Sequence, residues 1–274
     1  MSNASFLRVR YNNEDLSVAV RTRLVSDDLI LFMHGFGCAK ESFSEAFRQE
    51  QLKAFSICTF DFPGHGASPS ADRSAYSMQA FADIANQLID QLLPRRVYLI
   101  CHSMGGAVGL IASQDRDDIG CYISIDGNLV AEDCGLVSRE TAAQSPEYYT
   151  AVGYDAFIAG LQNSPRPDYA AWASWCVKAD STALHESAKS LVDWSDSGKL
   201  LDLFKSLSCK AYVHGDADDK QYVTSKLAQV PICEIRSSGH FMMIDNPRGL
   251  YATLADLLLQ ARAHYNAVAD IPSL

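Results

Sequence analysis

The sequence predicts an α/β protein, with a mostly parallel central sheet covered by helices on both faces and an inserted helical cap. Short apolar runs recur along the chain, and helix-length segments separate most of them. Strands that are apolar throughout are typical of a parallel sheet buried on both faces. Segment 128–205 interrupts this alternation, because it contains no strand-like run and is rich in aromatic residues.

The first elements are predicted to form a hairpin. Apolar residues alternate over 7–11 and 16–20, and the polar residues Asn12-Asn13-Glu14-Asp15 separate the two stretches. Such a pattern is typical of two antiparallel strands joined by a tight turn. Six apolar runs then predict the buried strands of the sheet, at 29–33, 55–60, 97–100, 121–125, 211–213 and 232–235.

Two segments carry clear helix signals. Over 77–93 the apolar residues repeat at helical spacing behind Ser77, whose side chain can cap the first turn. A second helix is predicted to begin at Asp245-Asn246-Pro247, where a capping residue precedes a proline at the first helical position.

The long segment without strands is predicted to be a helical cap. A structureless loop of that length is improbable inside a compact domain, so we expect helices packed over the carboxyl edge of the sheet. The predicted core therefore comprises 1–127 and 206–274, and the cap comprises 128–205, inserted after the sixth core strand.

Composition excludes several classes of protein. The 274 residues are 48% hydrophobic and carry a net charge of −10, which is typical of a folded domain and not of a nucleic-acid-binding surface. No apolar run approaches the roughly 20 residues of a membrane span, and no signal peptide is indicated. The eight cysteines contain no Cys-x-x-Cys pair. We therefore expect a cytoplasmic protein with reduced, mostly buried thiols.

The strongest motif follows the predicted strand 97–100. The residues Cys101-His102-Ser103-Met104-Gly105-Gly106 lead directly into a plausible helix. A serine on a sharp turn between strand and helix is held exposed above the sheet, as in a nucleophile elbow. In this motif the chain resembles the α/β-hydrolase family, whose elbow reads Gly-x-Ser-x-Gly. It departs from the family at Cys101, so the helix must stand further off or a neighbour must be small.

The resemblance extends to two glycine loops. It implies that His34-Gly35-Phe36-Gly37 forms the oxyanion loop, in which the backbone amides of Phe36 and Met104 would bind the oxyanion. The loop Asp61-Phe62-Pro63-Gly64-His65-Gly66-Ala67-Ser68 matches a family motif that is structural and not catalytic.

The resemblance also implies the base and the acid that a serine nucleophile needs. His240 follows the last predicted strand, at the place where the family has its catalytic histidine. For the acid, the family pattern Gly-x-x-Asp after the seventh strand selects Asp218 over Asp216 and Asp219 of the same turn. Asp126, after the sixth strand, is the rival. The catalytic residues implied are thus Ser103, Asp218 and His240.

These residues imply a serine hydrolase that cleaves a small carboxylic ester with an apolar portion. Thioesters and lactones remain open as substrates, and the oligomeric state is not indicated. We expect no cofactor and no metal ion. Two alternatives are a receptor-like family member that binds a small molecule with little turnover, and a carbon–carbon bond hydrolase. Members of the latter class usually carry Trp after the catalytic histidine, where this chain has Phe241.

Overall fold

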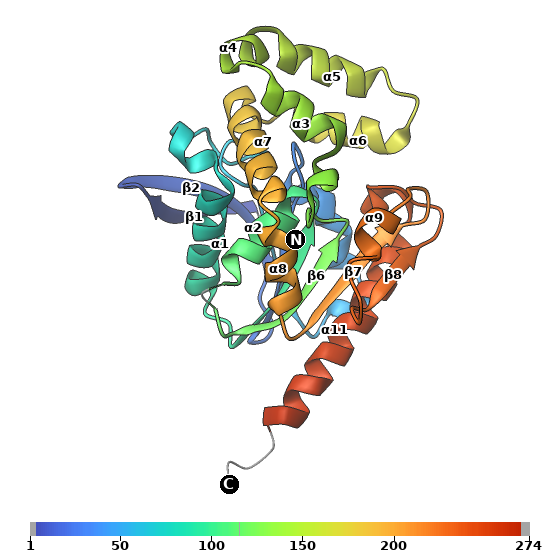
Figure 1. The fold of residues 1–274 in the computed structure, drawn as a ribbon. Helices are drawn as coiled ribbons and strands as arrows, with labels where there is room; N and C mark the ends of the chain where they lie inside the picture. Colours follow the sequence, from blue (N-terminus) through green and yellow to red (C-terminus); the bar gives the residue numbers. More distant parts are fainter. Residues whose placement is uncertain (1–3, 115, 270–274) are drawn as a thin grey trace.

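An eight-stranded sheet forms the centre of the molecule (Figure 1). The structure is a computed structural model that describes residues 4–114 and 116–269. The strand order is β1-β2-β4-β3-β5-β6-β7-β8. β2 runs antiparallel to both of its neighbours, β1 and β4, and every other neighbouring pair in this sheet is parallel. The strands are β1 (Ala4–Tyr11), β2 (Glu14–Arg23), β3 (Asp28–Met33), β4 (Ser56–Phe60), β5 (Arg96–His102), β6 (Ile119–Ile125), β7 (Lys210–Gly215) and β8 (Ile232–Ile235). The predicted α/β architecture is confirmed.

The hairpin of β1 and β2 turns at the predicted polar residues. Asn12 and Asn13 both have positive φ, at 46° and 68°. Two consecutive residues with positive φ make the tight turn whose twist matches that of paired strands, and asparagine tolerates this conformation. The turn therefore sets the register in which Tyr11 pairs with Glu14.

The main helices begin at the predicted caps. In α1 (Met78–Leu92) the Ser77 side chain accepts a hydrogen bond from the amide of Ala80. In α11 (Pro247–Ala269) Asn246 accepts from the amide of Gly249, directly before the proline. These side chains satisfy amides that have no partner within the helix.

The two faces of the sheet are covered by different helices. On one face, α2 (Met104–Ala112) packs against β5 and contacts α1 and α8 (Lys199–Ser206). On the other face, Arg96 of β5 lies under the ring of Tyr265 in α11, at 3.6 Å from the ring centroid. Tyr98 also faces this side and packs edge-on against Phe55. Side chains alternate across a strand, so β5 contributes to both halves of the core.

Every secondary-structure element between β6 and β7 is a helix or a helical turn, as expected. Helices of this segment lie over the carboxyl edge of the sheet in Figure 1; they are α3 (Gly135–Ala143), α4 (Pro146–Tyr148), α5 (Tyr154–Gln162) and α6 (Pro167–Cys176). A short 3₁₀ helix at 131–134 leads into α3, and a π-helical turn at 149–153 joins α4 to α5. The next helices, α7 (Ser181–Asp196) and α8, run down beside α1 and α2. The division at 128 and 205 remains a prediction.

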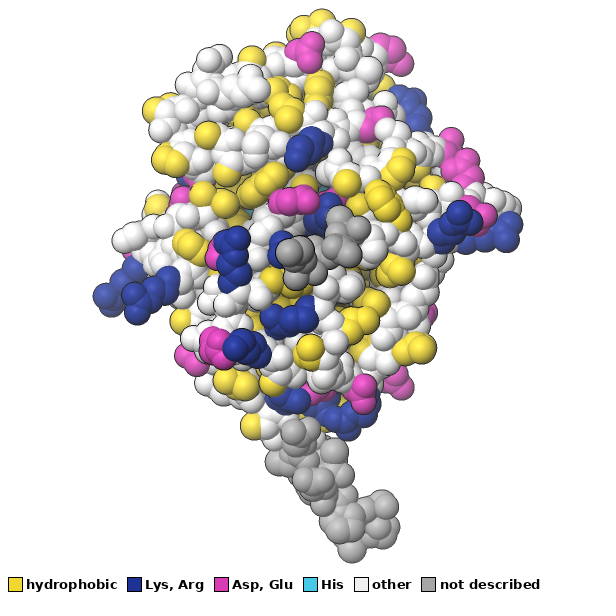
Figure 2. Space-filling view, turned by 180° about the vertical axis from the view of Figure 1, so that it is seen from behind, with side chains coloured by type: hydrophobic (Ala, Val, Ile, Leu, Met, Phe, Trp, Pro, Cys, Tyr) yellow, Lys and Arg dark blue, Asp and Glu magenta, His cyan; other side chains and the backbone are white. Residues whose placement is uncertain are grey.

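Short helical turns complete the chain. They are 3₁₀ turns at 40–48, 50–52 and 73–76, together with α9 (Gln221–Thr224) and α10 (Met242–Asp245). Within the described residues, no helix has both the length and the hydropathy that crossing a membrane requires. On the face shown in Figure 2, Lys and Arg side chains lie in separate small groups among acidic and hydrophobic ones. All eight cysteines fall in the described part of the chain, where each is a free thiol and six are buried.

Candidate active site

Ser103 lies on a strained turn between β5 and α2. Its φ is 52° and its ψ is −122°, a conformation that costs free energy for a residue with a side chain. The turn is held by the amide of Ser103, which donates to the carbonyl of Ile125, and by the carbonyl of Ser103, which accepts from Gly106. The predicted elbow is therefore present as a local geometry.

The two glycines after the elbow allow close packing of α2. A Cβ at Gly105 would lie 2.5 Å from the carbonyl oxygen of Met33, and one at Gly106 would lie 2.7 Å from the Cα of Gly127. Backbone on both sides cannot move away, so neither position accommodates a side chain. The start of α2 is thereby fixed against the ends of β3 and β6.

Cys101 stands where the elbow of the family that the chain resembles has glycine, and a small neighbour accommodates it. A Cβ built on Gly109 of α2 would lie 2.4 Å from the Cys101 sulfur. The missing side chain at Gly109 thus provides the space that the thiol fills. Of the two arrangements expected from the sequence, the structure has the small neighbour.

The loop after β3 is fixed by His34. The imidazole is fully buried and joins two loops, because Nε2 accepts from the amide of Phe62 at 3.1 Å and Nδ1 lies 2.9 Å from the carbonyl of Gly35. These partners require a neutral ring with the proton on Nδ1. Burial, and then the neighbouring His65, lower the pKa of His34 well below its ordinary value.

The amides of Phe36 and Met104 have no acceptor among the hydrogen bonds of the described residues. Met104 is the first residue of α2, so its amide has no partner within the helix. Free amides at this place are suited to bind a developing negative charge on oxygen.

The second glycine loop surrounds Asp61, which is completely buried. One carboxylate oxygen accepts from the backbone amide of Lys40 at 2.6 Å, and the other accepts from the Lys40 ammonium at 2.7 Å and the amide of Ala67 at 2.8 Å. A Cβ on Gly66, whose φ is 55°, would overlap this carboxylate. The loop thus has a complete structural role.

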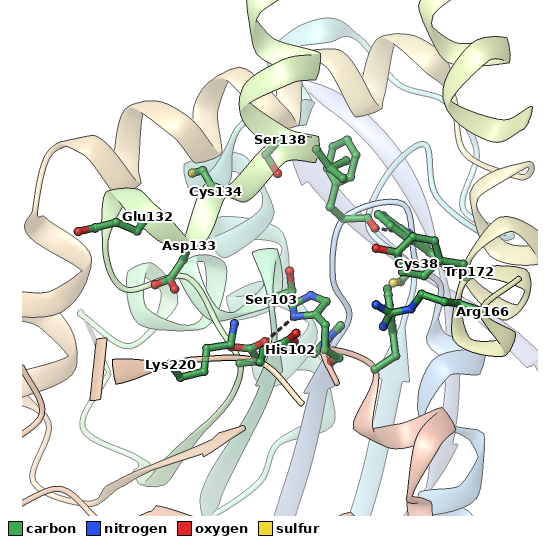
Figure 3. A pocket seen from close by; sticks show the side chains of 18 of the residues that line it. Cys38, His102, Ser103, Glu132, Asp133, Cys134, Ser138, Arg166, Trp172 and Lys220 are labelled. Carbon is green, nitrogen blue, oxygen red and sulfur yellow. Dashed lines mark hydrogen bonds and ion pairs between the residues drawn. The ribbon is translucent and has the colours of Figure 1, made fainter. Parts of the chain in front are cut away.

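His240 is paired with Asp126. The Nδ1 nitrogen of His240 lies 2.6 Å from Oδ2 of Asp126, which is the bond drawn as a dashed line near Ser103 in Figure 3. Asp126 follows β6 directly and has a φ of 44°. Burial raises the pKa of Asp126, but the neighbouring His240 and Lys220 outweigh it and hold that pKa below its ordinary range. Asp126 is therefore ionised and oriented toward the imidazole.

The structure does not pair His240 with Asp218, the acid that the resemblance implies; the imidazole is bonded to Asp126. Asp218 is exposed on the loop after β7. The physical reason is the strand order, because β6 is paired with β5 and ends beside the elbow, with His102 opposite Ile125. The loop after β7 begins one strand further away.

His102 supports the backbone of His240. Its Nε2 lies 3.0 Å from the carbonyl oxygen of His240, and the two rings are 4.6 Å apart. The ring is buried, and burial together with the nearby His240 lowers the pKa of His102 to about 3. The neutral Nε2–H therefore donates to this carbonyl.

Ser103, Asp126 and His240 share one cavity of about 260 Å³. Figure 3 shows Lys220 and Asp133 on one side of Ser103, with Trp172 and Arg166 on the other. The Arg166 guanidinium forms two hydrogen bonds with Asp168 and lies over the ring of Tyr169. A cavity of this size is slightly smaller than those that hold drug-sized ligands, which favours a small substrate.

The cap contacts the loop after β3 directly. Trp172 of α6 donates from its indole nitrogen to the carbonyl oxygen of Phe36 at 2.8 Å. The same indole packs against Phe241, with ring centroids 5.2 Å apart. Trp172 thus links the cap to the loop after β3 and to the residue that follows His240, and it also lines the cavity that contains Ser103.

Sequence reasoning missed the partners of the acid. Lys220 and Tyr212 both contact Asp126, and their contacts depend on where β7 and its following loop lie beside β6. The pattern Ser124-Ile125-Asp126-Gly127, an acid at the end of an apolar strand, was the available signal for Asp126 itself.

Among the described residues, no group of three or more His, Cys, Asp or Glu is arranged to hold a metal ion.

Known proteins resemble this chain in sequence. The model of the Alpha/beta hydrolase family matches residues 30–253. A putative esterase/lipase 2 of Mycoplasma genitalium is 38% identical over 87 residues, which are 32% of this chain and 32% of that protein. The chain therefore spans about a third of the length of this curated relative. A 2-succinyl-6-hydroxy-2,4-cyclohexadiene-1-carboxylate synthase of Citrobacter koseri is 24% identical over 250 residues, covering 84% of this chain and 93% of that protein.

Solved structures share the fold at lower identity. A carboxylesterase structure from Nitrososphaera gargenis superposes with a TM-score of 0.78 at 16% identity, over 94% of this chain and all (100%) of that one. The N-acyl homoserine lactonase AidH, complexed with N-butanoyl homoserine, superposes with a TM-score of 0.73 at 18% identity, over 94% and 97%. At these identities the likeness concerns the fold.

Proposed function

The chain belongs to the alpha/beta hydrolase family, and from this membership we propose that it hydrolyses small carboxylic esters through a covalent acyl intermediate on Ser103. The observation that carries the proposal is the bond between His240 and Asp126 in the cavity that also holds Ser103. A serine is a useful nucleophile when a base removes its proton and an acid orients the base. The names of the relatives, esterase/lipase and carboxylesterase, support the same substrate class.

The proposed acylation step uses the nitrogen of His240 that Asp126 leaves free. Because Nδ1 is bonded to Asp126, Nε2 takes the proton of Ser103 as the hydroxyl oxygen attacks the ester carbonyl. The resulting oxyanion accepts hydrogen bonds from the amides of Phe36 and Met104. His240 then gives the proton to the leaving alcohol, and the acyl group remains on Ser103.

The proposed deacylation repeats these roles with water. His240 takes a proton from a water molecule, which attacks the acyl carbonyl and forms a second oxyanion at the same amides. Collapse of this intermediate returns the proton to Ser103 and releases the carboxylic acid. Asp126 stays ionised throughout and stabilises the imidazolium in both steps.

The test is the substitution Ser103→Ala, measured on p-nitrophenyl esters of increasing acyl length. We expect the wild type to prefer short acyl groups, because the cavity is about 260 Å³, and the variant to lose at least about 10³-fold in kcat. The matched control is Ser113→Ala, which removes a buried serine from the other end of α2. If Ser103→Ala stays within tenfold of the wild type, the nucleophile is wrongly assigned.

The same panel separates the alternatives. Thioesters and lactones of matched size identify the bond that is cleaved, and a fluorophosphonate probe is expected to label one peptide containing Ser103. A single slow turnover with a ligand-dependent melting temperature would favour the receptor-like alternative. Turnover of carbon–carbon substrates without ester turnover would favour the carbon–carbon bond hydrolase.

A further inference from the structure

Both oxygens of the Asp126 carboxylate are occupied, and by groups of different charge. Oδ2 accepts from His240 at 2.6 Å. Oδ1 accepts from the ammonium of Lys220 at 2.8 Å and from the hydroxyl of Tyr212 at 3.0 Å. The carboxylate thus contacts an imidazole through one oxygen and an ammonium group through the other.

Lys220 is placed so that its charge acts on this carboxylate with little screening by water. Its side chain is 14% exposed, and Asp126 is 2% exposed. It directly precedes α9, on the loop that follows β7, and Figure 3 shows its side chain pointing into the cavity toward the carboxylate. Ion pairs in such partly buried positions interact more strongly than pairs on the surface.

Other charged and titratable groups lie around Asp126 and Lys220. His102, at the end of β5, is neutral because its pKa is lowered to about 3. Asp133 accepts hydrogen bonds from the amides of Leu129 and Val130 and from Tyr222 of α9.

Three more charged groups line the cavity from the cap and the loop after β7. Glu132, just before α3, is paired with Lys226. Arg166, at the start of α6, is paired with Asp168, and Asp218 is exposed to solvent. Of the Lys and Arg side chains that line the cavity in the described part of the chain, Lys220 is the one bonded to Asp126.

We propose that Lys220 is a positioning residue for the reaction, which fixes Asp126 and weakens its hold on the proton of His240. A carboxylate neutralised by an ammonium stabilises an imidazolium less than a free carboxylate does. His240 then remains an unprotonated base at a more acidic pH. The inference rests on the proposed function, in which His240 is that base.

The test compares the pH profile of kcat/KM for the wild type, Lys220→Met and Lys220→Arg. In Lys220→Met the acid limb of the profile is expected to move up by about one pH unit, because His240 binds its proton more tightly beside an uncompensated carboxylate. Lys220→Arg keeps the cation and is expected to keep the limb. Melting temperatures show that each variant is folded.

Two controls separate charge from structure. Lys226→Met removes a nearby lysine that is paired with Glu132 and is expected to leave the profile unchanged. Tyr212→Phe removes a neutral donor to the same oxygen and is expected to move the limb less than Lys220→Met. A loss of rate in Lys220→Met that is equal at every pH, or an equal displacement in Lys226→Met, would overturn the proposal.

A measurement without turnover distinguishes this inference from the proposed function. The protonation midpoint of the His240 ring is followed by NMR in Ser103→Ala protein, with and without Lys220→Met. An upward displacement supports the role of Lys220 even if no ester is hydrolysed. An unchanged midpoint overturns it even if esters are hydrolysed.

Discussion

Ser103 and Asp126, whose side chains belong to the candidate site, both have positive φ and directly follow the adjacent strands β5 and β6. Ser103 has a φ of 52° and Asp126 has a φ of 44°. For residues other than glycine this conformation costs about 1–3 kcal/mol, so surrounding contacts must maintain it. Here the amide of Asp126 donates to the carbonyl of Val213 and its carboxylate is bound on both oxygens. The strained backbone conformation thus occurs at the two residues, Ser103 and Asp126, whose side chains line the cavity.

At the scale of single residues, two matched substitutions test which aspartate is the acid that orients His240. Asp126→Asn is expected to lower kcat by about 10⁴-fold, because the amide cannot stabilise the imidazolium or fix its tautomer. Asp218→Asn alters an exposed side chain and is expected to change kcat by less than about threefold. Both are measured on the ester that the wild type cleaves best. The opposite ranking would restore Asp218 as the acid.

At the scale of elements, the elbow depends on the fit between β5 and α2. Cys101 and Gly109 form a complementary pair, since the thiol fills the space that a Cβ on Gly109 would take. The contact is completed by Tyr122 of β6, whose hydroxyl donates to the carbonyl of Gly106. Close packing of this helix is what holds Ser103 at the tip of the turn.

The fit is tested by a double-mutant cycle. Gly109→Ala is expected to lower the free energy of unfolding by about 1–3 kcal/mol, because the added methyl overlaps the Cys101 sulfur in a packed core. Cys101→Gly in the same chain removes that overlap and is expected to recover a large part of the loss. Urea unfolding of the four proteins measures the coupling. Additive losses would show that the two residues do not compete for the space.

At the scale of the whole molecule, three buried neutral histidines link stability to pH. Burial is the first cause that lowers the pKa of His34, His65 and His102. In the unfolded chain each ring binds a proton near its ordinary value of about 6.5. As pH falls below that value the unfolded state gains protons that the folded state does not, so folding becomes less favourable.

We therefore expect the free energy of unfolding to fall below about pH 6.5, by about 1.4 kcal/mol per pH unit for each ring that stays neutral. For His102 the loss continues until its folded pKa of about 3 is reached. Urea unfolding between pH 7 and pH 5 measures the slope. His102→Gln is expected to reduce it, and His264→Gln, at an exposed position of α11, is expected to leave it unchanged. A slope that His102→Gln does not alter would contradict this account.

The sequence by itself determined the fold and much of the site's local geometry. Apolar strand runs, the Ser77 cap and the Asn12-Asn13 turn are short-range signals, because the residues that act together are neighbours in the chain. The same holds for the turn at Ser103 and for the glycine loops, whose backbone conformations follow from a few consecutive residues. The catalytic roles of Ser103 and His240 stay predictions until activity is measured.

Only the tertiary structure decided which acid meets His240 and what surrounds that acid. Asp126 and Asp218 both follow apolar strands, so the local pattern does not distinguish them. The choice depends on the lateral order of β5, β6 and β7, which brings the end of β6 beside the elbow. Lys220 and Tyr212 join Asp126 for the same reason. A hydrogen bond forms within about 3 Å, and which residues come that close is set by the packing of elements far apart in the chain.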